Sequence, residues 1–351
     1  MSETAAILAQ MVDRLFADHV TPALLAAVDG GCWPQELWTL AEAQGLTSAL
    51  IPEVQGGMGS SFEDAFVIVR AAGRHRVPLP LPETIAAGWL LASAGIEVPP
   101  GPLSLAGAHP GDQLWLERNG AGWQMSGTAR RVAWGRVANA VALPVRYGDT
   151  TLIVQAPRAG CTVENGTNLA GEFRDTLVYR NHPVDAAPWE HGFSSDPVAV
   201  IGAMMRSGQM AGALSDVLER SVTYANDRRQ FGRPIGKQQA IQQNLAVLAA
   251  EAAAVEVAAE AAFLAADRGN SEFLVAVAKV RAGIAVSQAV GIAHQVHGAI
   301  GFTLEYPLHW STRRLMSWRT EFGSDRHWAV ILGRRILDLG PDGFWPQVTA
   351  S

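Results

Sequence analysis

The stretch that decides the fold joins two long helical patterns and reads Arg228-Arg229-Gln230-Phe231-Gly232-Arg233-Pro234-Ile235-Gly236-Lys237-Gln238-Gln239. A second stretch near the C-terminus reads Gln295-Val296-His297-Gly298-Ala299-Ile300-Gly301-Phe302-Thr303. Both place planar amide donors and glycines at the end of a helical pattern, and the first adds guanidinium cations. Because such a junction suits a pyrophosphate and an aromatic ring system, we expect the two stretches to form one cofactor site.

The composition indicates a globular protein of two or three subdomains. The 351 residues are 48% hydrophobic and 17% charged, too apolar for a disordered chain and too many for one small core. The net charge of −6, without a run of Lys and Arg, argues against nucleic-acid binding. Residues 245–266 form the longest apolar stretch, but they include three glutamates, so we expect no membrane span.

The cysteines and the N-terminus bear on metal binding and location. Cys32 and Cys161 are far apart and match no paired metal spacing, so we expect no metal site. The first twenty residues lack a cationic start followed by an apolar block, which argues against a signal peptide. A reducing compartment suits two free thiols, and we therefore expect a cytoplasmic protein.

Three segments with different patterns follow one another. Residues 1–102 show helical periodicity broken by glycine turns and predict an N-terminal helical domain. Residues 103–190 carry short β-prone runs and predict a small, shortened β-barrel or sandwich. Residues 191–351 are Ala-rich with helical spacing and predict a C-terminal four-helix bundle. The prolines of residues 77–82 predict a tight connector. The expected fold class is mainly α with a central β domain.

This order, together with the two quoted stretches, resembles the acyl-CoA dehydrogenase family over most of the chain. Near the N-terminus, Pro52-Glu53 followed by Gly56-Gly57-Met58-Gly59 resembles the family's PE-x-x-GG-x-G turn. In the bundle, Tyr224-Ala225-Asn226-Asp227-Arg228-Arg229-Gln230-Phe231-Gly232, with Gln239 eight positions after the Phe, resembles the family element that reaches over a subunit boundary to the FAD of its partner.

The resemblance implies a role for each matched residue. Arg228 is expected to pair with the pyrophosphate, Phe231 to pack on the cofactor, and Gln230 and Gln239 to make hydrogen bonds. The second stretch matches the Q-x-x-GG-x-G segment that closes over the ADP part of FAD, and this match assigns Gln295 and Gly298. Ala299 stands where the second glycine is usual. His297 lies inside the same motif, where we expect a packing residue rather than a catalytic one.

The family's chemistry implies a catalytic base. Members remove the α-proton of an acyl-CoA with a carboxylate while the β-hydride passes to FAD, and a trans-2-enoyl-CoA results. In most members the base opens an E-G-T-like turn, and here Glu321 is the candidate, although a gapless match places Phe322 at that position. Between Trp318 and Phe322 we expect an apolar pocket that raises the pKa of the carboxyl group. The alternative is a surface Glu within a charged run, and the family's other base position corresponds here to Gly202.

The β segment departs from the family pattern. The usual Thr-Glu-Pro and Ser-Asp groups are missing from residues 103–112, and Arg131 and Ala133 stand where a Trp and a Thr normally lie beside the flavin. A chain that keeps the arm for a neighbour's FAD but lacks groups for its own implies a second, different subunit. The sequence thus resembles the smaller subunits of heterotetrameric (α2β2) acyl-CoA dehydrogenases of steroid catabolism.

Three hypotheses remain open from the sequence. In the first, the chain is a catalytic subunit that acts on a bulky acyl-CoA, such as a steroid-derived thioester, and passes electrons to an electron-transfer flavoprotein or similar acceptor. In the second, it is a non-catalytic subunit that stabilises FAD binding by its partner. In the third, it is a homo-oligomeric flavoenzyme with a different substrate.

Overall fold

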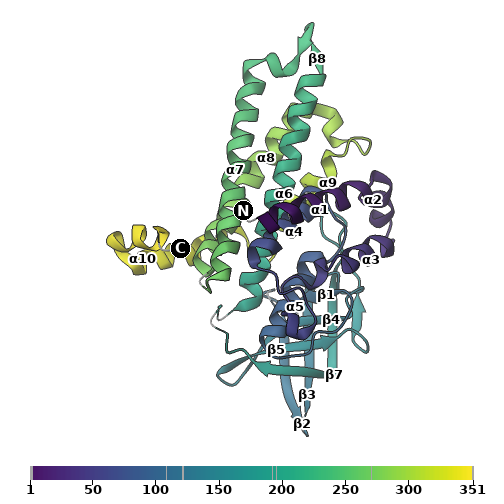
Figure 1. The fold of residues 1–351 in the computed structure, drawn as a ribbon, viewed down its shortest axis with the longest axis vertical. Coiled ribbons are helices and arrows are strands. Elements are labelled where there is room, and N and C mark those ends of the chain that lie inside the picture. The colour runs from purple at the N-terminus through teal and green to yellow at the C-terminus, as the bar shows by residue number, and fades with distance from the viewer. Residues whose placement is uncertain are drawn as a thin grey trace. The chain divides into compact units, whose positions relative to one another are not determined.

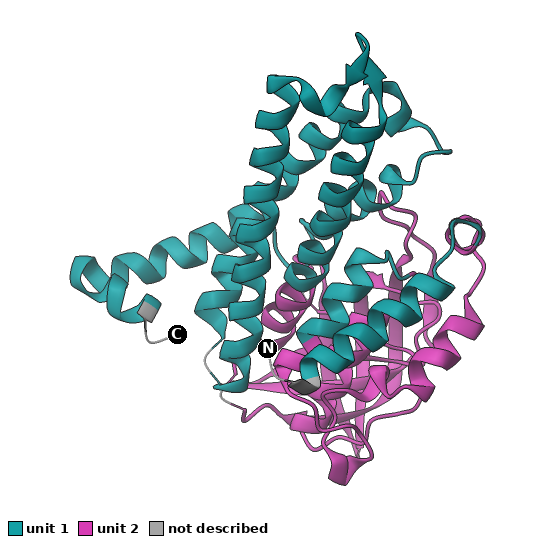
Figure 2. Cartoon of the chain, turned by 45° about the horizontal axis from the view of Figure 1, so that its top comes forward, with its two compact units in different colours: residues 1–23, 66–77, 206–351 teal, residues 24–65, 78–205 magenta. Residues whose placement is uncertain are grey.

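The structure, a computed structural model, describes residues 3–107, 109–120, 122–191, 193–194, 196–269 and 271–349. Contacts divide the chain into two compact units (Figure 2). Unit 1 comprises residues 1–23, 66–77 and 206–351, and unit 2 comprises residues 24–65 and 78–205. The N-terminal helices, the central sheet and the C-terminal helices confirm the fold class expected from the sequence.

Unit 1 is helical and is built around the long C-terminal helices (Figure 1). Its helices are α1 (Glu3–His19), most of α4 (Phe62–Arg74), α6 (Pro197–Asp227) from Arg206 onward, α7 (Gln239–Asp267), α8 (Glu272–His297), α9 (Leu308–Trp318) and α10 (Asp325–Thr349). Small residues allow close packing between these helices. A Cβ atom added at Gly212 of α6 would lie 1.9 Å from the carbonyl oxygen of Arg70 in α4, so only glycine permits this approach.

Helix α8 is long and apolar enough to cross a membrane when continued to Phe302. More than half of its apolar stretch is buried inside the protein, however, and the stretch packs against α7, α9 and α10. Lys279, which lies in α8, is also fully buried. These are the properties of a core helix.

Unit 2 combines short helices with a seven-stranded sheet. Its helical elements are most of α2 (Pro22–Asp29), α3 (Gln35–Ala43), η1 (Leu46–Ser48), η2 (Glu53–Gln55) and α5 (Leu81–Ser93). The connector expected over residues 77–82 ends earlier than predicted, because α5 begins at Leu81 and Pro82 lies in its first turn. A first-turn N–H group has no partner within the helix, so proline is tolerated there.

The sheet follows the order β1-β4-β5-β7-β3-β2, with β6 also paired to β7. The strands are β1 (Leu103–Leu105), β2 (Gln113–Asn119), β3 (Gly122–Ala133), β4 (Ala140–Tyr147), β5 (Thr150–Pro157), β6 (Thr162–Glu164) and β7 (Arg174–Pro188). The first part of β7 pairs with β3 and β6, and its last part pairs with β5, so this long strand joins two groups of strands. Apolar residues of both groups, including Val141, Val154 and Leu177, form one core.

The shortened segment at residues 103–112 and the substituted positions in β3 lie in unit 2. Ala108 falls outside the described residues. Arg131 lies at an irregularity of β3 with φ of 55° and is exposed, whereas Ala133 is buried. The family's Trp and Thr are therefore replaced by a solvent-facing cation and a small core residue.

Candidate functional site

The first candidate stretch folds as a β-hairpin between α6 and α7 (Figure 1). Strands β8 (Arg229–Gln230) and β9 (Arg233–Pro234) pair, and η3 (Ile235–Lys237) leads into α7. The two loop residues, Phe231 and Gly232, have φ of 51° and 78°. A two-residue hairpin loop needs positive φ at its centre, which glycine adopts readily and a bulky side chain does not.

Phe231 is consequently held at the tip of the hairpin, away from the helical core. Its exposed fraction is 94%, and the backbone conformation that places it there is unfavourable for an aromatic residue. Burial of a Phe side chain normally contributes about 1.5–3 kcal/mol to stability, and this fold does not use that contribution. An aromatic side chain presented in this way is suited to packing against something outside the chain.

The second candidate stretch lies at the C-terminal end of α8. Gln295 is exposed, and Gly298 ends the helix with φ of 63° and begins η4 (Gly298–Phe302). A Cβ atom added at Gly298 would meet no atom within 4 Å, so the backbone there is open to close approach. Ala299, which replaces the family's second glycine, is exposed in η4.

His297 makes the contacts of a packing residue, as expected. Its Nδ1 lies 2.7 Å from the carbonyl oxygen of Ala293, and its ring stacks on Tyr224 at 4.6 Å between centroids. Its Nε2 lies 3.2 Å from the hydroxyl oxygen of Tyr306. Burial lowers the pKa of His297, which favours the neutral ring.

The two stretches meet at one end of the helical bundle. Ile235, from the base of the hairpin, and Val296, from the end of α8, belong to one apolar cluster with Ala225 of α6. Tyr224, Ile241, Leu245 and Ile292 complete this cluster, which we call the hairpin-base cluster. The hairpin is thereby fixed beside the α8 terminus, so the residues predicted to bind one cofactor are brought together.

The exposed groups at this end fit part of a dinucleotide cofactor. The cations Arg228, Arg229, Arg233 and Lys237 are all exposed, and so are the amides of Gln230, Gln239 and Gln295. Guanidinium groups and amides are donors that suit a pyrophosphate, and the open backbone at Gly298 allows a ligand to approach. These residues therefore fit the phosphate-bearing part of FAD.

Glu321 lies in a different part of unit 1, in the turn between α9 and α10. Its side chain is 10% exposed, and the Nε atom of Arg206 donates a hydrogen bond to its Oε2 at 2.8 Å. Arg206 is 1% exposed and also bonds to Gln209. The surroundings of Glu321 include a cation that the expected apolar pocket did not: the Arg206 guanidinium lies 5.5 Å from the centre of the Phe322 ring and is paired with the carboxylate.

Two residues of this region were missed by the sequence reasoning, namely Arg206 and Lys279. Each is a buried cation within an apolar helical stretch, and a charge at such a position is rarely left unpaired. That signal was present in the sequence. The partner Glu321 could not be identified in the same way, because it is 115 residues from Arg206 along the chain.

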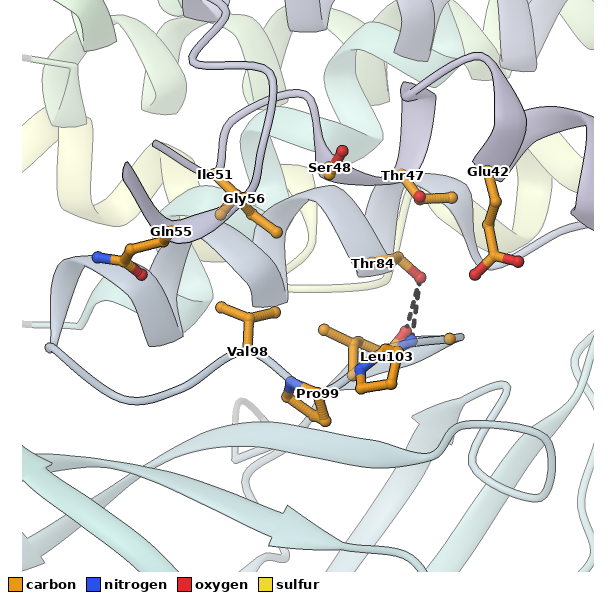
Figure 3. Close-up of a pocket in the computed structure, with 12 residues that line it drawn as sticks. Glu42, Thr47, Ser48, Ile51, Gln55, Gly56, Thr84, Val98, Pro99 and Leu103 are labelled. Atoms are coloured by element: carbon orange, nitrogen blue, oxygen red, sulfur yellow. Dashed lines mark hydrogen bonds between the residues drawn. The ribbon is translucent and has the colours of Figure 1, made fainter. Parts of the chain in front are cut away.

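Two hollows in the described part of the chain contain none of the predicted site residues. One is a cavity of about 210 Å³ within unit 2, and Glu42, Thr47, Thr84, Val98 and Pro99 are among the residues that line it (Figure 3). The Thr84 hydroxyl there bonds to the backbone of Leu103. The other is an open apolar hollow of about 570 Å³ between α7 and α8, lined by Ala253, Ala254, Val257, Ala258, Ala261, Leu274, Val277 and Arg281.

The fold and the comparisons with known proteins define the class of protein to which this chain belongs. Residues 2–97 match the model of the acyl-CoA dehydrogenase N-terminal domain, and residues 200–337 match that of the acyl-CoA dehydrogenase C-terminal domain. The chain belongs to the acyl-CoA dehydrogenase family, whose members are oxidoreductases that normally depend on FAD.

Individual relatives and solved structures are similar to this chain over most of its length. The chain is 30% identical over 320 residues to acyl-CoA dehydrogenase IpdE2 of Mycobacterium tuberculosis, covering 88% of this chain and 89% of that protein. Among solved structures, a variant of the Tcur3481-Tcur3483 steroid ACAD superimposes with a TM-score of 0.86 at 24% identity, over 96% of this chain and 98% of that one. The ChsE4-ChsE5 complex from Mycobacterium tuberculosis gives 0.84 at 22% identity, over 95% and 97%.

Proposed function

We propose that this chain is one subunit of a heteromeric, FAD-dependent acyl-CoA dehydrogenase that converts a bulky acyl-CoA thioester, such as a steroid-derived one, to the 2-enoyl-CoA. The observation that carries the proposal is the hairpin tip, where Phe231 is 94% exposed beside four exposed cations. Two similar structures, the ChsE4-ChsE5 complex and the Tcur3481-Tcur3483 steroid ACAD, support both the pairing of unlike chains and the substrate class.

Glu321 is the proposed base. Its carboxylate accepts the α-proton of the acyl group while the β-carbon loses a hydride, so the two carbons become joined by a double bond. When bound, FAD would supply the acceptor for the hydride, and the proposed electron acceptor of the complex is an electron-transfer flavoprotein or a similar protein. A carboxylate must be ionised to accept a proton, and the guanidinium of Arg206 is paired with the Glu321 carboxylate at 2.8 Å.

The hairpin and the α8 terminus hold the cofactor in this proposal. Arg228 would contact the pyrophosphate, Phe231 would pack on the cofactor, and Gln230 and Gln239 would make hydrogen bonds to it. A third amide, from Gln295, and the open backbone at Gly298 would hold the ADP part. Because β3 carries Arg131 and Ala133 in place of aromatic and hydroxyl groups, the partner subunit supplies the remaining wall of the site.

One observation favours a second candidate, in which the chain is a non-catalytic subunit of the same complex. A guanidinium at 2.8 Å stabilises the carboxylate and makes Glu321 a weaker base. An ion pair buried this deeply is also what a purely structural residue would form. A direct test of Glu321 separates the two candidates.

The test is Glu321→Gln in the assembled complex. Gln keeps the size of the side chain and can still accept a hydrogen bond from Arg206, but it cannot take a proton. We expect turnover to fall by about 10²–10⁴-fold while the flavin absorbance stays the same. The matched control is Glu305→Gln, because Glu305 is exposed near the end of α8 and no role is assigned to it. Full activity of Glu321→Gln would establish the non-catalytic subunit instead.

The partners and the location belong to the same proposal. An acyl-CoA substrate, a second acyl-CoA dehydrogenase-like subunit in an α2β2 assembly and a cytoplasmic location agree with the family and with the burial of α8. Expression of this chain alone distinguishes the homo-oligomer. A yellow, FAD-containing protein would favour that alternative, and a colourless or insoluble one would favour the unequal pair.

A further inference from the structure

Lys279 is an unusual residue in this chain. The sequence contains two lysines, Lys237 and Lys279, and the second lies in the N-terminal part of α8 and is 0% exposed. Burial of an ammonium group is costly unless its three donors find acceptors. The acceptors here are all backbone carbonyl oxygens from the turn that carries Glu321.

The Nζ atom of Lys279 donates hydrogen bonds to the carbonyl oxygens of Arg319 at 2.8 Å and Gly323 at 2.7 Å. A third, longer contact of 3.4 Å reaches the carbonyl oxygen of Trp318. Trp318 ends α9, where carbonyl groups have no partner within the helix and the helix dipole favours a cation. The ammonium therefore caps α9 and spans the turn on both sides of Glu321.

The turn itself needs such support. Phe322 and Gly323 have consecutive φ values of 52° and 89°, and a left-handed conformation is unfavourable for Phe. Trp328 adds a hydrogen bond from its indole N–H to the carbonyl oxygen of Phe322 at 2.8 Å. A strained turn persists only when its surroundings fix it, and here the fixing groups converge on the residues beside Glu321.

Charged groups from several elements surround the ammonium. Burial lowers the pKa of Lys279 to about 7, and Glu321 opposes this shift while Arg206 adds to it. Asp325 also raises the pKa and Arg319 also lowers it. Two buried cations thus lie around Glu321: Arg206 is paired with its carboxylate, and Lys279 is hydrogen-bonded to backbone carbonyl groups of the residues on either side of it.

We propose that Lys279 is the positioning residue of Glu321: by holding the carbonyl groups of Arg319 and Gly323, it fixes where the Glu321 carboxylate lies. Arg206 fixes the carboxylate from the side of α6, so the two cations define its position together. The catalytic part of this inference rests on the proposed function, whereas the hold on the turn does not.

Hydrogen exchange in the purified complex, without substrate, tests the hold on the turn. In Lys279→Met, the amides of residues 319–324 should exchange about 10- to 100-fold faster than in the wild type, because two carbonyl groups lose a charged donor. Lys279→Arg should recover part of the protection. Lys237→Met is the control and should leave exchange of this turn unchanged. Wild-type exchange rates in Lys279→Met would overturn the proposal.

A second measurement needs no variant and applies even where Lys279→Met does not fold. In protein labelled with ¹³Cε-lysine, only two lysine signals are expected. The signal of Lys279 should titrate well below the range of a free lysine, and a titration of both signals within that range would overturn the enclosure of its ammonium.

Kinetics of the assembled complex test the link to Glu321. Lys279→Met should lower kcat by about tenfold or more and leave KM nearly unchanged, since Lys279 contacts neither substrate nor flavin in this account. Faster exchange of the turn with unchanged kcat would overturn the positioning role. An inactive wild-type complex would count against the proposed function alone, because the exchange comparison uses no substrate.

Discussion

At the residue scale, the proposed role of Glu321 as a base and its ion pair with Arg206 place opposing requirements on the carboxyl group. A base must accept a proton, but its partner Arg206 favours the carboxylate over the carboxylic acid. Removal of one partner from a buried pair leaves the other charge without compensation, which is costly. The pair is therefore a strong local determinant of where the carboxylate lies.

The coupling between Arg206 and Glu321 can be measured by a double-mutant cycle. Arg206→Met should lower the free energy of unfolding by roughly 3–5 kcal/mol, and the double variant with Glu321→Gln should recover part of that loss. The control is the exposed pair Arg14–Asp18, where a 3.8 Å contact should be worth less than about 1 kcal/mol. Strict additivity at the buried pair would contradict its assigned importance.

The pH dependence of stability reports on Lys279. Because the pKa of Lys279 is about 7 in the fold and higher in the unfolded chain, the unfolded state binds more protons above pH 7. The free energy of unfolding should therefore rise between about pH 7 and 10, by roughly 3–5 kcal/mol more in the wild type than in Lys279→Met. Denaturant titrations at several pH values check this, and parallel curves for the two proteins would contradict the burial of a titrating amine.

At this scale the sequence predicts local features and misses non-local ones. Phe231 and Gly232 could be proposed from the sequence as part of a cofactor site because both residues belong to one short stretch. The pairing of Glu321 with Arg206 depends on how α6 packs beside the α9–α10 turn, which no local pattern reveals. For that reason the prediction for Glu321 included its apolar neighbours but not the guanidinium of Arg206.

At the scale of elements, variants of the hairpin allow its contribution to the stability of the fold to be measured apart from its contribution to flavin binding. Phe231→Ala should change the free energy of unfolding by less than about 0.5 kcal/mol, because its side chain is already exposed. It should nevertheless weaken flavin retention in the complex. Ile235→Ala, four residues along and 8% exposed in the hairpin-base cluster, is the control and should destabilise by about 2–4 kcal/mol. Unchanged flavin retention in Phe231→Ala would contradict the role of the hairpin tip.

The packing of helices in unit 1 can be tested with another matched pair of variants. Gly212→Ala should destabilise by about 1–3 kcal/mol or more, because its Cβ would collide with the backbone of α4. Gly291→Ala in α8 has no atom within 4 Å of the new Cβ and should stabilise by about 0.5–1 kcal/mol. Thermal unfolding of the two variants checks this, and equal shifts would contradict the close contact between α4 and α6.

At the scale of the whole molecule, the order of helical, β and helical segments followed from periodicity alone, since each segment changes its pattern over many residues. The start of α5 was misplaced because proline excludes only the interior of a helix and not its first turn. A partner subunit was inferred from what β3 lacks, and the exposed hairpin tip supports the same inference from what unit 1 presents.

The FAD content of the native complex tests the central claim most directly. The chain would be isolated from its own host through an affinity tag, and released flavin and both polypeptides would be quantified. A flavin completed by one copy of each of two unlike chains predicts a second acyl-CoA dehydrogenase-like polypeptide in equal amount and about one FAD for every two polypeptides. A complex of this chain alone with one FAD bound to every copy would contradict the account.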